Sequence, residues 1–408
     1  MTHIYQLLLD KLSSKQSQIS YWFAAKFQNI PLHFYNSVDI RHFGHKIAPI
    51  DTNCFPAGFN HLSKKSRKIA SQKAQEYLNN NSPKTQKILI LAESHTKNLR
   101  YLENILSLAN IIKNAGYEVQ IANLNSEISD ILEIDLENNQ KITINKIIRK
   151  NDRITTLNGF NPDLIISNND FTDGIADILQ NIEQKIIPNP NFGWFIRSKS
   201  EHFKQYNILA QEFANLIDID PWLISTKFDL AKNLNFKQKI GIDNLIIKTG
   251  KLLRELQEKY QQYDIKSDPY CFIKADNGTY GMAIMTVKSA DELVDLNKKN
   301  RNKMNMLKGN VQNHQVIIQE GIPTIDRIKG FNAEPMIYMI NGKIIGNLFR
   351  YNEARDERNN LNSRSMEFSD LNILDDSDIN LGSKREEIIK IYEIIAKISA
   401  LAAANEQY

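Results

Sequence analysis

The chain has 408 residues, of which 42% are hydrophobic and 24% charged, a composition typical of a folded globular protein. Because one hydrophobic core stops growing at roughly 250–300 residues, this length predicts two or three lobes with a cleft between them. The 51 basic and 47 acidic residues nearly cancel and are interspersed along the chain, which argues against a nucleic-acid partner.

We expect no targeting signal in the N-terminal region. Residues 1–16 have apolar side chains at helical spacing but no basic leader region or cleavage site, and no run of about 20 apolar residues follows, so we expect neither secretion nor a membrane span. We interpret the basic cluster at residues 64–68 as a solvated helix face rather than a polyanion site. Cys54 and Cys271 lack disulfide or zinc spacing, which fits a reducing cytoplasm.

An alternating α/β region is predicted after a polar linker at residues 79–84. Its expected strands lie at residues 87–91, 118–122, 163–167 and 186–188. Its expected helices lie at residues 98–115 and after Thr172. This alternation favours a mainly parallel sheet, whose ligands collect at the carboxyl ends of the strands. The polar segments 93–95 and 167–170 follow two of these strands and are candidate ligand contacts.

A different pattern occupies the second half of the chain. It predicts a long helix at 243–262, a glycine-bearing hairpin with strands at 270–274 and 283–287, further strands at 315–319, 335–340 and 343–350, and a terminal helix at 385–404.

The hairpin loop supplies the chemistry of a phosphate site. Lys274 ends a strand, and Gly278, Thr279, Tyr280 and Gly281 follow at once, offering a cation beside flexible backbone N–H groups. A plain tight hairpin explains these residues equally well when they are taken alone. The chain contains neither GxxxxGK[ST] nor GxGxxG, so a Walker or Rossmann phosphate site is not predicted.

The order of four elements resembles the ATP-grasp class. Lys274 with its glycine loop is followed by an apolar strand ending in Gln319-Glu320-Gly321-Ile322, a strand ending in Arg350, and the polar loop 358–362. The resemblance implies that Glu320 contacts adenine or ribose, that the backbone of Gln319 and Ile322 lines the base, and that Lys227 is a further phosphate lysine. Arg350 would face the transferred phosphoryl group. Considered by itself, Arg350 is as readily a surface salt bridge.

In ATP-grasp enzymes, the metal-binding strands usually follow the polar loop and a helix. In this chain, the segment that resembles those strands lies near the N-terminus, at residues 37–58. Asp39, Asp51 and Asn53 reproduce the expected spacing and would bind Mg²⁺ through hard oxygen atoms, which implies a circularly permuted ATP-grasp fold. An Asx turn at residues 51–53 is the alternative interpretation. Glu334 is the first substitute ligand should these residues face away from Lys274.

Residues 37–60 and 275–282 are also similar to a bacterial glutamate-cysteine ligase family of ATP-grasp type, distinct from the glutamine-synthetase-like ligases. The resemblance implies the first step of glutathione biosynthesis, with glutamate and cysteine as small-molecule substrates and ATP and Mg²⁺ as cofactors. Arg41, Glu93, Arg358 and Asn360 are candidate substrate contacts. A homo-oligomer is left open.

The expected α/β architecture divides into an N-terminal segment completing the catalytic lobe (1–64), a parallel-sheet lobe on the substrate side (85–217), a nucleotide-covering lobe (218–312) and the catalytic lobe (313–408). Two alternatives stay open: a ligase of another amino-acid pair, and an ATP-binding protein without catalysis.

Overall fold

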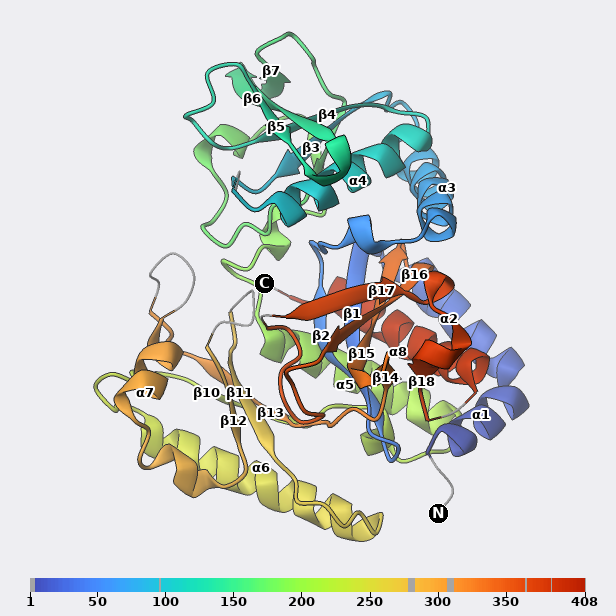
Figure 1. The fold of residues 1–408 in the computed structure, drawn as a ribbon, viewed down its shortest axis with the longest axis vertical. Helices are drawn as coiled ribbons and strands as arrows, with labels where there is room; N and C mark the ends of the chain where they lie inside the picture. The colour runs from blue at the N-terminus through green and yellow to red at the C-terminus, as the bar shows by residue number, and fades with distance from the viewer. Residues whose placement is uncertain are drawn as a thin grey trace.

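Three β-sheets organise the part of the chain that the computed structural model describes, which comprises residues 4–94, 97–277, 283–306, 312–363, 365–382 and 384–407. Figure 1 shows one sheet with its helices at the top, a second at the lower right and the third at the lower left. Within these residues, no helix is long and apolar enough to cross a membrane.

The upper sheet is mainly parallel. Its order is β5-β6-β4-β3-β8-β9, and β7 pairs with β6. The strands are β3 (Lys87–Ala92), β4 (Glu118–Asn123), β5 (Ile131–Asp135), β6 (Lys141–Lys150), β7 (Arg153–Thr156), β8 (Leu164–Ser167) and β9 (Lys185–Ile187). Helices α3 (Lys64–Asn81) and α4 (Leu99–Asn114) bury apolar side chains in the same core as Ile88 and Ile90 of β3. This core fixes the carboxyl ends of β3 and β8 side by side.

The sheet at the lower right is antiparallel and has the order β17-β16-β15-β1-β2, with the short strand β14 beside β15 and the short strand β18 beside β14. Its strands are β1 (Tyr35–His42), β2 (Ile47–Asn53), β14 (Arg327–Ile328), β15 (Phe331–Ile340), β16 (Lys343–Asn352), β17 (Met366–Asp370) and β18 (Ile379–Asn380). Residues from the two ends of the chain therefore share one sheet. The N-terminal hairpin pairs with β15, so β15 lies between the hairpin and β16.

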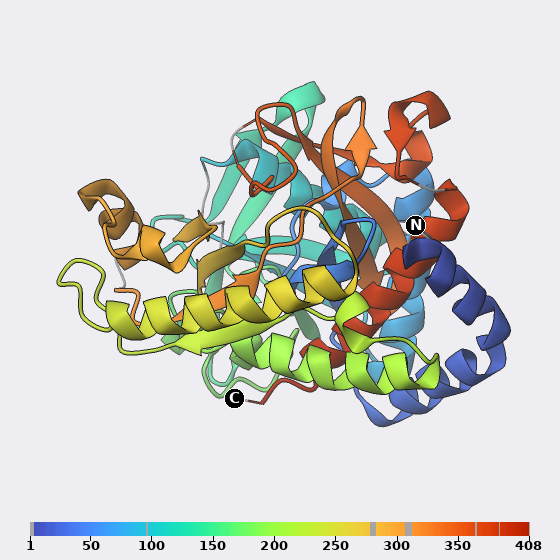
Figure 2. The ribbon, with the colours of Figure 1, turned by 90° about the horizontal axis from the view of Figure 1, so that it is seen from below.

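Helices cover this second sheet. They are α1 (Ile4–Ser14), α2 (Gln16–Asn29), α5 (Lys199–Leu216) and α8 (Arg385–Ala404). Ile388 and Ile395 of α8 lie in one apolar core with Val38 and Ile40 of β1. The first two helices lie at the outer edge of the molecule (Figure 2).

The third sheet forms a small lobe with the order β10-β13-β11-β12. Its elements are β10 (Phe228–Ala231), α6 (Ile242–Gln262), β11 (Cys271–Ala275), β12 (Ile284–Val287), α7 (Lys298–Asn305) and β13 (Val316–Glu320). Leucines of α6 pack in one core with Ile273 and Ile318. The chain enters through β10 and leaves through β13, and the amide N–H of Glu320 donates to the carbonyl oxygen of Lys227 at 2.9 Å. Both connections thus meet at one point.

Short 3-10 segments complete the described elements: Phe59–His61, Glu137–Asn139, Asp177–Leu179, Pro190–Phe192, Pro221–Leu223, Ala290–Leu293, Leu371–Ile373 and Asp376–Asp378. The prediction of a helix after Thr172 is wrong, because only the short 3-10 segment Asp177–Leu179 is helical there. Phe171 and Gly174 have φ values of 50° and 88°, and the Asp170 side chain accepts from the Thr172 N–H, a local turn that competes with a helix.

Three boundaries differ from those expected. Helix α3 continues through Asn81 into the predicted linker. Helix α5 packs in the core of the antiparallel sheet rather than with the parallel-sheet lobe. Strand β13 belongs to the small sheet, which therefore extends to Glu320, past the expected boundary at residue 312.

Candidate active site

A cavity of about 390 Å³ lies where the three sheets meet. Its lining includes the following predicted site residues: Asp39, Arg41, Asp51, Asn53, Glu93, Lys274, Gln319, Glu320, Arg350 and Asn360. Lys227, Ile322 and Arg358 are not part of this lining. Gly278, Thr279, Tyr280 and Gly281 lie outside the described residues.

The β1–β2 hairpin presents two carboxylates to the cavity. Asp39 and Asp51 are direct partners across the antiparallel pair, and side chains of such partners project on the same face of the sheet. The Asn53 side-chain oxygen accepts the N–H of Phe55 at 2.9 Å, so this residue forms the Asx turn that we had weighed as the alternative. Asp51 is not part of that turn, and its side chain is 42% exposed.

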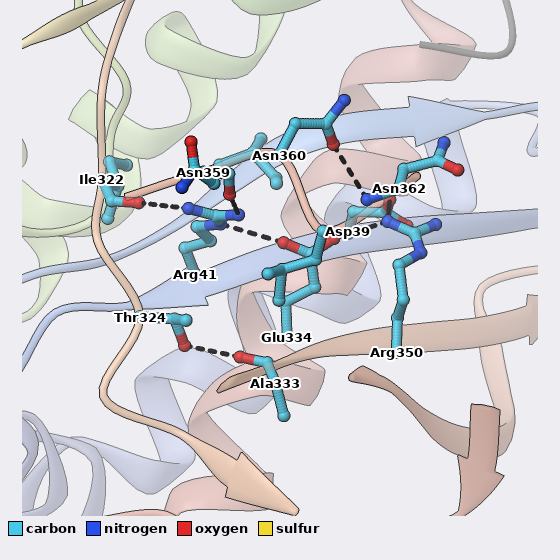
Figure 3. A network of polar contacts seen from close by, with 12 residues as sticks. Asp39, Arg41, Ile322, Thr324, Ala333, Glu334, Arg350, Asn359, Asn360 and Asn362 are labelled. Carbon is cyan, nitrogen blue, oxygen red and sulfur yellow. Dashed lines mark hydrogen bonds and ion pairs between the residues drawn. The ribbon is translucent and has the colours of Figure 1, made fainter. Parts of the chain in front are cut away.

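Arg350 lies between two carboxylates (Figure 3). Its Nη1 is 2.9 Å from Asp39 Oδ2 and 2.5 Å from Glu334 Oε1, and Glu334 is its partner across β15 and β16. Burial disfavours the charged guanidinium, but the two carboxylates outweigh it and raise the pKa of Arg350. Burial raises the pKa of Asp39 to about 6, with Arg350 opposing and Glu334 and Asp51 adding repulsion. An alternative role for Arg350 as an exposed surface pair does not fit its 6% exposure.

Arg41 holds the walls of the cavity together. Its Nε donates to Glu334 at 2.9 Å, and its terminal nitrogens donate to the carbonyl oxygens of Ile322, Glu357 and Asn359 (Figure 3). Four of its N–H groups are therefore committed to the protein. These contacts join Arg41 to the polar loop that contains Asn360 and to Glu334.

Two lysines from different lobes face Asp51. Lys199 Nζ lies 3.1 Å from Asp51 Oδ1, and Lys274 Nζ lies 3.4 Å from the carbonyl oxygen of Ile50. Burial lowers the pKa of Lys274 to about 8, with Asp51 opposing. Burial would raise the pKa of Asp51, but Lys199 and Lys274 outweigh it and lower the value to about 2. The cavity therefore combines anionic and cationic groups at short range.

The remaining nucleotide-site predictions have other protein partners. Lys227 Nζ is 2.9 Å from Glu255. The Glu320 carboxylate accepts from Lys46 at 2.7 and 2.8 Å, from Trp222 Nε1 at 3.0 Å and from the Lys227 N–H at 2.9 Å. The carboxylate that the ATP-grasp resemblance places against adenine or ribose thus also binds donors from three other residues of the protein.

Arg358 belongs to the polar loop, and Ile322 is joined to that loop through Arg41. The guanidinium of Arg358 lies 5.8 Å from the centre of the Tyr270 ring, and the carbonyl oxygen of Ile322 binds Arg41.

The parallel sheet contributes a polar wall. Glu93 and Asp170 follow β3 and β8, both are buried, and the Asp170 N–H donates to Glu93 Oε1 at 2.9 Å. Asn104 of α4 accepts the N–H groups of Gly58 and Phe59 at 2.8 and 3.0 Å. Ligands of open α/β sheets collect at this edge, as the sequence predicts.

Sequence reasoning missed Lys199, Trp194 and Asn104, which also line the cavity, whereas the lining residue Asn168 belongs to the predicted segment 167–170. A signal for Lys199 was present, because Ser198-Lys199-Ser200-Glu201 is a capping-box pattern, and the Ser198 side chain does accept the N–H of Glu201. The positions of Trp194 and Asn104 depend on tertiary packing, and these residues carry no local signal.

The oxygen atoms of Asp39, Asp51 and Asn53 have the chemistry that Mg²⁺ prefers. The repulsion that Glu334 and Asp51 exert on Asp39 is the kind of electrostatic cost that a bound cation relieves. Among the described residues, no group of three or more His, Cys, Asp or Glu side chains is arranged to hold a metal ion. The predicted set reaches three ligands only through the Asn53 amide.

Comparison with known proteins identifies clear relatives. A family model described as GshA, glutamate-cysteine ligase, matches residues 10–407. The chain is similar to a crystal structure from Methylobacillus flagellatus KT, of a protein provisionally assigned as a gamma-glutamylcysteine synthetase, with 37% identity, a TM-score of 0.90 and coverage of 98% of this chain and 95% of that one. A glutathione synthetase-like effector (GSS30) from Globodera pallida covers 85% of this chain and 82% of its own, but its 9% identity and TM-score of 0.39 carry no argument. No curated protein matches the chain.

Proposed function

Because the chain belongs to the glutamate-cysteine ligase family, we propose that it joins the γ-carboxylate of L-glutamate to the amine of L-cysteine with ATP, the first step of glutathione biosynthesis. The observation that carries this proposal is the meeting of Lys274 and Arg350, from two different lobes, with the carboxylates of Asp39, Asp51 and Glu334 in one cavity. A reaction between a carboxylate and a triphosphate needs such fixed charges.

The first step is attack of the glutamate γ-carboxylate on the γ-phosphorus of ATP. Lys274 and Arg350 would neutralise the oxygens of the transferred phosphoryl group. The amine of cysteine then attacks the γ-carbonyl carbon of γ-glutamyl phosphate, so that the amide bond forms and inorganic phosphate leaves. The protein contributes positioning and charge, and no covalent enzyme intermediate is needed.

Asp39, Asp51 and Asn53 would hold Mg²⁺, which supplies charge neutralisation on phosphate oxygens when bound. Arg350 pairs with Asp39 and Lys199 pairs with Asp51, so cationic side chains lie beside the oxygen atoms that would hold the ion. At the opposite wall, Glu93 has the charge to pair with the ammonium of an amino acid. Arg358 and Asn360 at the polar loop remain our candidates for its carboxylate.

The fold that fits this chemistry is a circularly permuted ATP-grasp fold. Its supporting observation is that β1 and β2, which carry Asp39 and Asp51, lie in one sheet with β16, which carries Arg350. In this scheme residues 1–64 complete the catalytic lobe, the parallel sheet faces the amino-acid substrates, and the small lobe covers the nucleotide.

The test is incubation of the pure protein with Mg-ATP and each pair of amino acids, with phosphate release and product mass as readouts. We expect γ-glutamylcysteine from glutamate and cysteine only when both are present. A much faster reaction with another pair would replace the substrate assignment by the alternative ligase. Nucleotide binding without any amino-acid-dependent phosphate release would favour the non-catalytic alternative.

A further inference from the structure

Lys199 is a second lysine of the cavity, contributed by the main body of the protein. It is the first residue of α5, its side chain is 8% exposed, and its Nζ lies 4.1 Å from the centre of the Trp194 ring. The ring covers one side of the ammonium and Asp51 lies within 3.1 Å. The charge of Lys199 is therefore directed into the cavity that Lys274 also lines.

The N-terminus of α5 is fastened to the small lobe through Asp276. This residue follows β11, two positions after Lys274, and is fully buried. Its carboxylate accepts the Ser200 N–H at 2.8 Å and the Ser200 hydroxyl at 2.7 Å, and it also accepts from the Gln315 amide. A carboxylate in this position is favoured by the unpaired N–H groups and the dipole of the helix.

A backbone contact joins the two lysine-bearing segments directly. The N–H of Lys199 donates to the carbonyl oxygen of Asp276 at 3.0 Å. Since Lys274 lies two residues before Asp276 in the chain, its position is mechanically linked to that of Lys199. We call these contacts of Asp276 with Lys199 and Ser200 the α5 clasp.

Lys227 is the competing candidate for a second phosphate lysine. Its side chain is 32% exposed, pairs with Glu255, and is absent from the cavity lining. Its charge is therefore neutralised outside the cavity, whereas that of Lys199 lies inside it.

We propose that Lys199 contacts the phosphate chain of the nucleotide together with Lys274, and that Asp276 is the positioning residue that places it. This inference rests on the proposed function, because the polyanion is taken to be a nucleoside triphosphate. It assigns one phosphate-binding cation to the small lobe and the other to α5, so that both lobes must be docked for full neutralisation.

The direct test compares the affinities of Lys199→Met, Lys199→Arg and the wild type for ATP and for adenosine by calorimetry. Since a hydrogen bond to a charged group contributes about 1.5–3 kcal/mol, we expect Lys199→Met to weaken ATP binding about tenfold or more, without affecting adenosine. Lys199→Arg should restore most of the affinity. The control is Lys204→Met on the same helix, where the side chain is 61% exposed and pairs with Glu201.

The clasp is tested with Asp276→Asn and the double variant Lys199→Met/Asp276→Asn. If Asp276 acts through Lys199, the single Asp276→Asn variant loses ATP affinity while the double variant is no worse than Lys199→Met. Additive losses, or equal losses for ATP and adenosine, would show that Asp276 has only a structural role and would overturn its positioning role.

The outcomes separate this inference from the function beneath it. A wild-type protein that ligates glutamate and cysteine, together with a folded Lys199→Met variant of unchanged ATP affinity, overturns the role of Lys199 alone. A wild-type protein that binds ATP no better than adenosine overturns the proposed function and this inference with it.

Discussion

Lys274 links the charge of the cavity to pH. Its folded pKa of about 8 lies below the ordinary value of 10.5, because burial disfavours the ammonium. Between these values the unfolded chain binds more protons, so this group makes folding more favourable as pH rises through the window. The same deprotonation removes a cation from the cavity.

We therefore expect ATP affinity to fall as pH rises above about 8 and proton uptake to accompany binding there. Calorimetry from pH 7 to pH 9 measures both. Lys274→Arg, whose guanidinium stays charged across this range, should flatten the profile. Parallel losses in the wild type and in Lys274→Arg would show that another group controls the dependence.

At the scale of single residues, the sequence indicated ten predicted contacts that do line the cavity. It could not assign their partners. Glu320 illustrates this limit. Its position after an apolar strand could be predicted from the sequence, but its partners Lys46 and Trp222 are 274 and 98 positions away. Such pairings are properties of the tertiary structure.

At the scale of secondary-structure elements, the small lobe is joined to the rest of the protein through contacts of Lys46, Glu320 and Trp222. Lys46 lies in the β1–β2 turn, is 1% exposed, and its Nζ lies 4.2 Å from the centre of the Trp222 ring. It thereby connects the antiparallel sheet to the point where the chain leaves β13. Close contact of Gly321 with the Tyr270 ring leaves no space for a side chain beside it.

Lys46→Met should destabilise the protein by about 3–5 kcal/mol, because removing one partner leaves a buried carboxylate without its counter-ion. Denaturant unfolding measures this loss. Lys73→Met is the matched control, since its pair with Glu76 is exposed and should be worth at most about 1 kcal/mol. In the double variant Lys46→Met/Glu320→Gln the loss should be smaller than the sum of the single losses, and additive losses would exclude direct coupling.

Elements with strong local patterns were predicted well. The terminal helix α8 spans the expected residues, and β3, β4 and α6 begin or end within a residue of their predicted bounds. Strands β5, β6 and β7 were missed. The residues of β5 are exposed or half-exposed along its length, so the strand has no buried apolar face to reveal it.

For the whole molecule, the sequence indicated that residues near the N-terminus and in the second half of the chain share a site. The meeting of Asp39, Asp51, Lys274 and Arg350 in one cavity agrees with that expectation. The contribution of α5 to the cavity could not be predicted from the sequence. Its helical pattern follows the parallel-sheet region in sequence, whereas its apolar face packs against α8. The position of α5 in the sequence therefore predicted the wrong packing partner for this helix.

The two connections of the small lobe to the main body meet at one point, which suggests a deletion that would remove this lobe. Lys227 and Glu320 are hydrogen-bonded, so residues 228–319 leave and rejoin the main body at one place and can be regarded as an inserted cassette. Replacing the cassette by a short glycine-serine bridge should leave a folded core with native far-UV circular dichroism and a cooperative, lower melting transition. Loss of that transition would mean that the core needs the cassette to fold. A surviving core would keep Arg350, Asp39 and Glu334 but lack Lys274, and could accept a covering lobe borrowed from a relative.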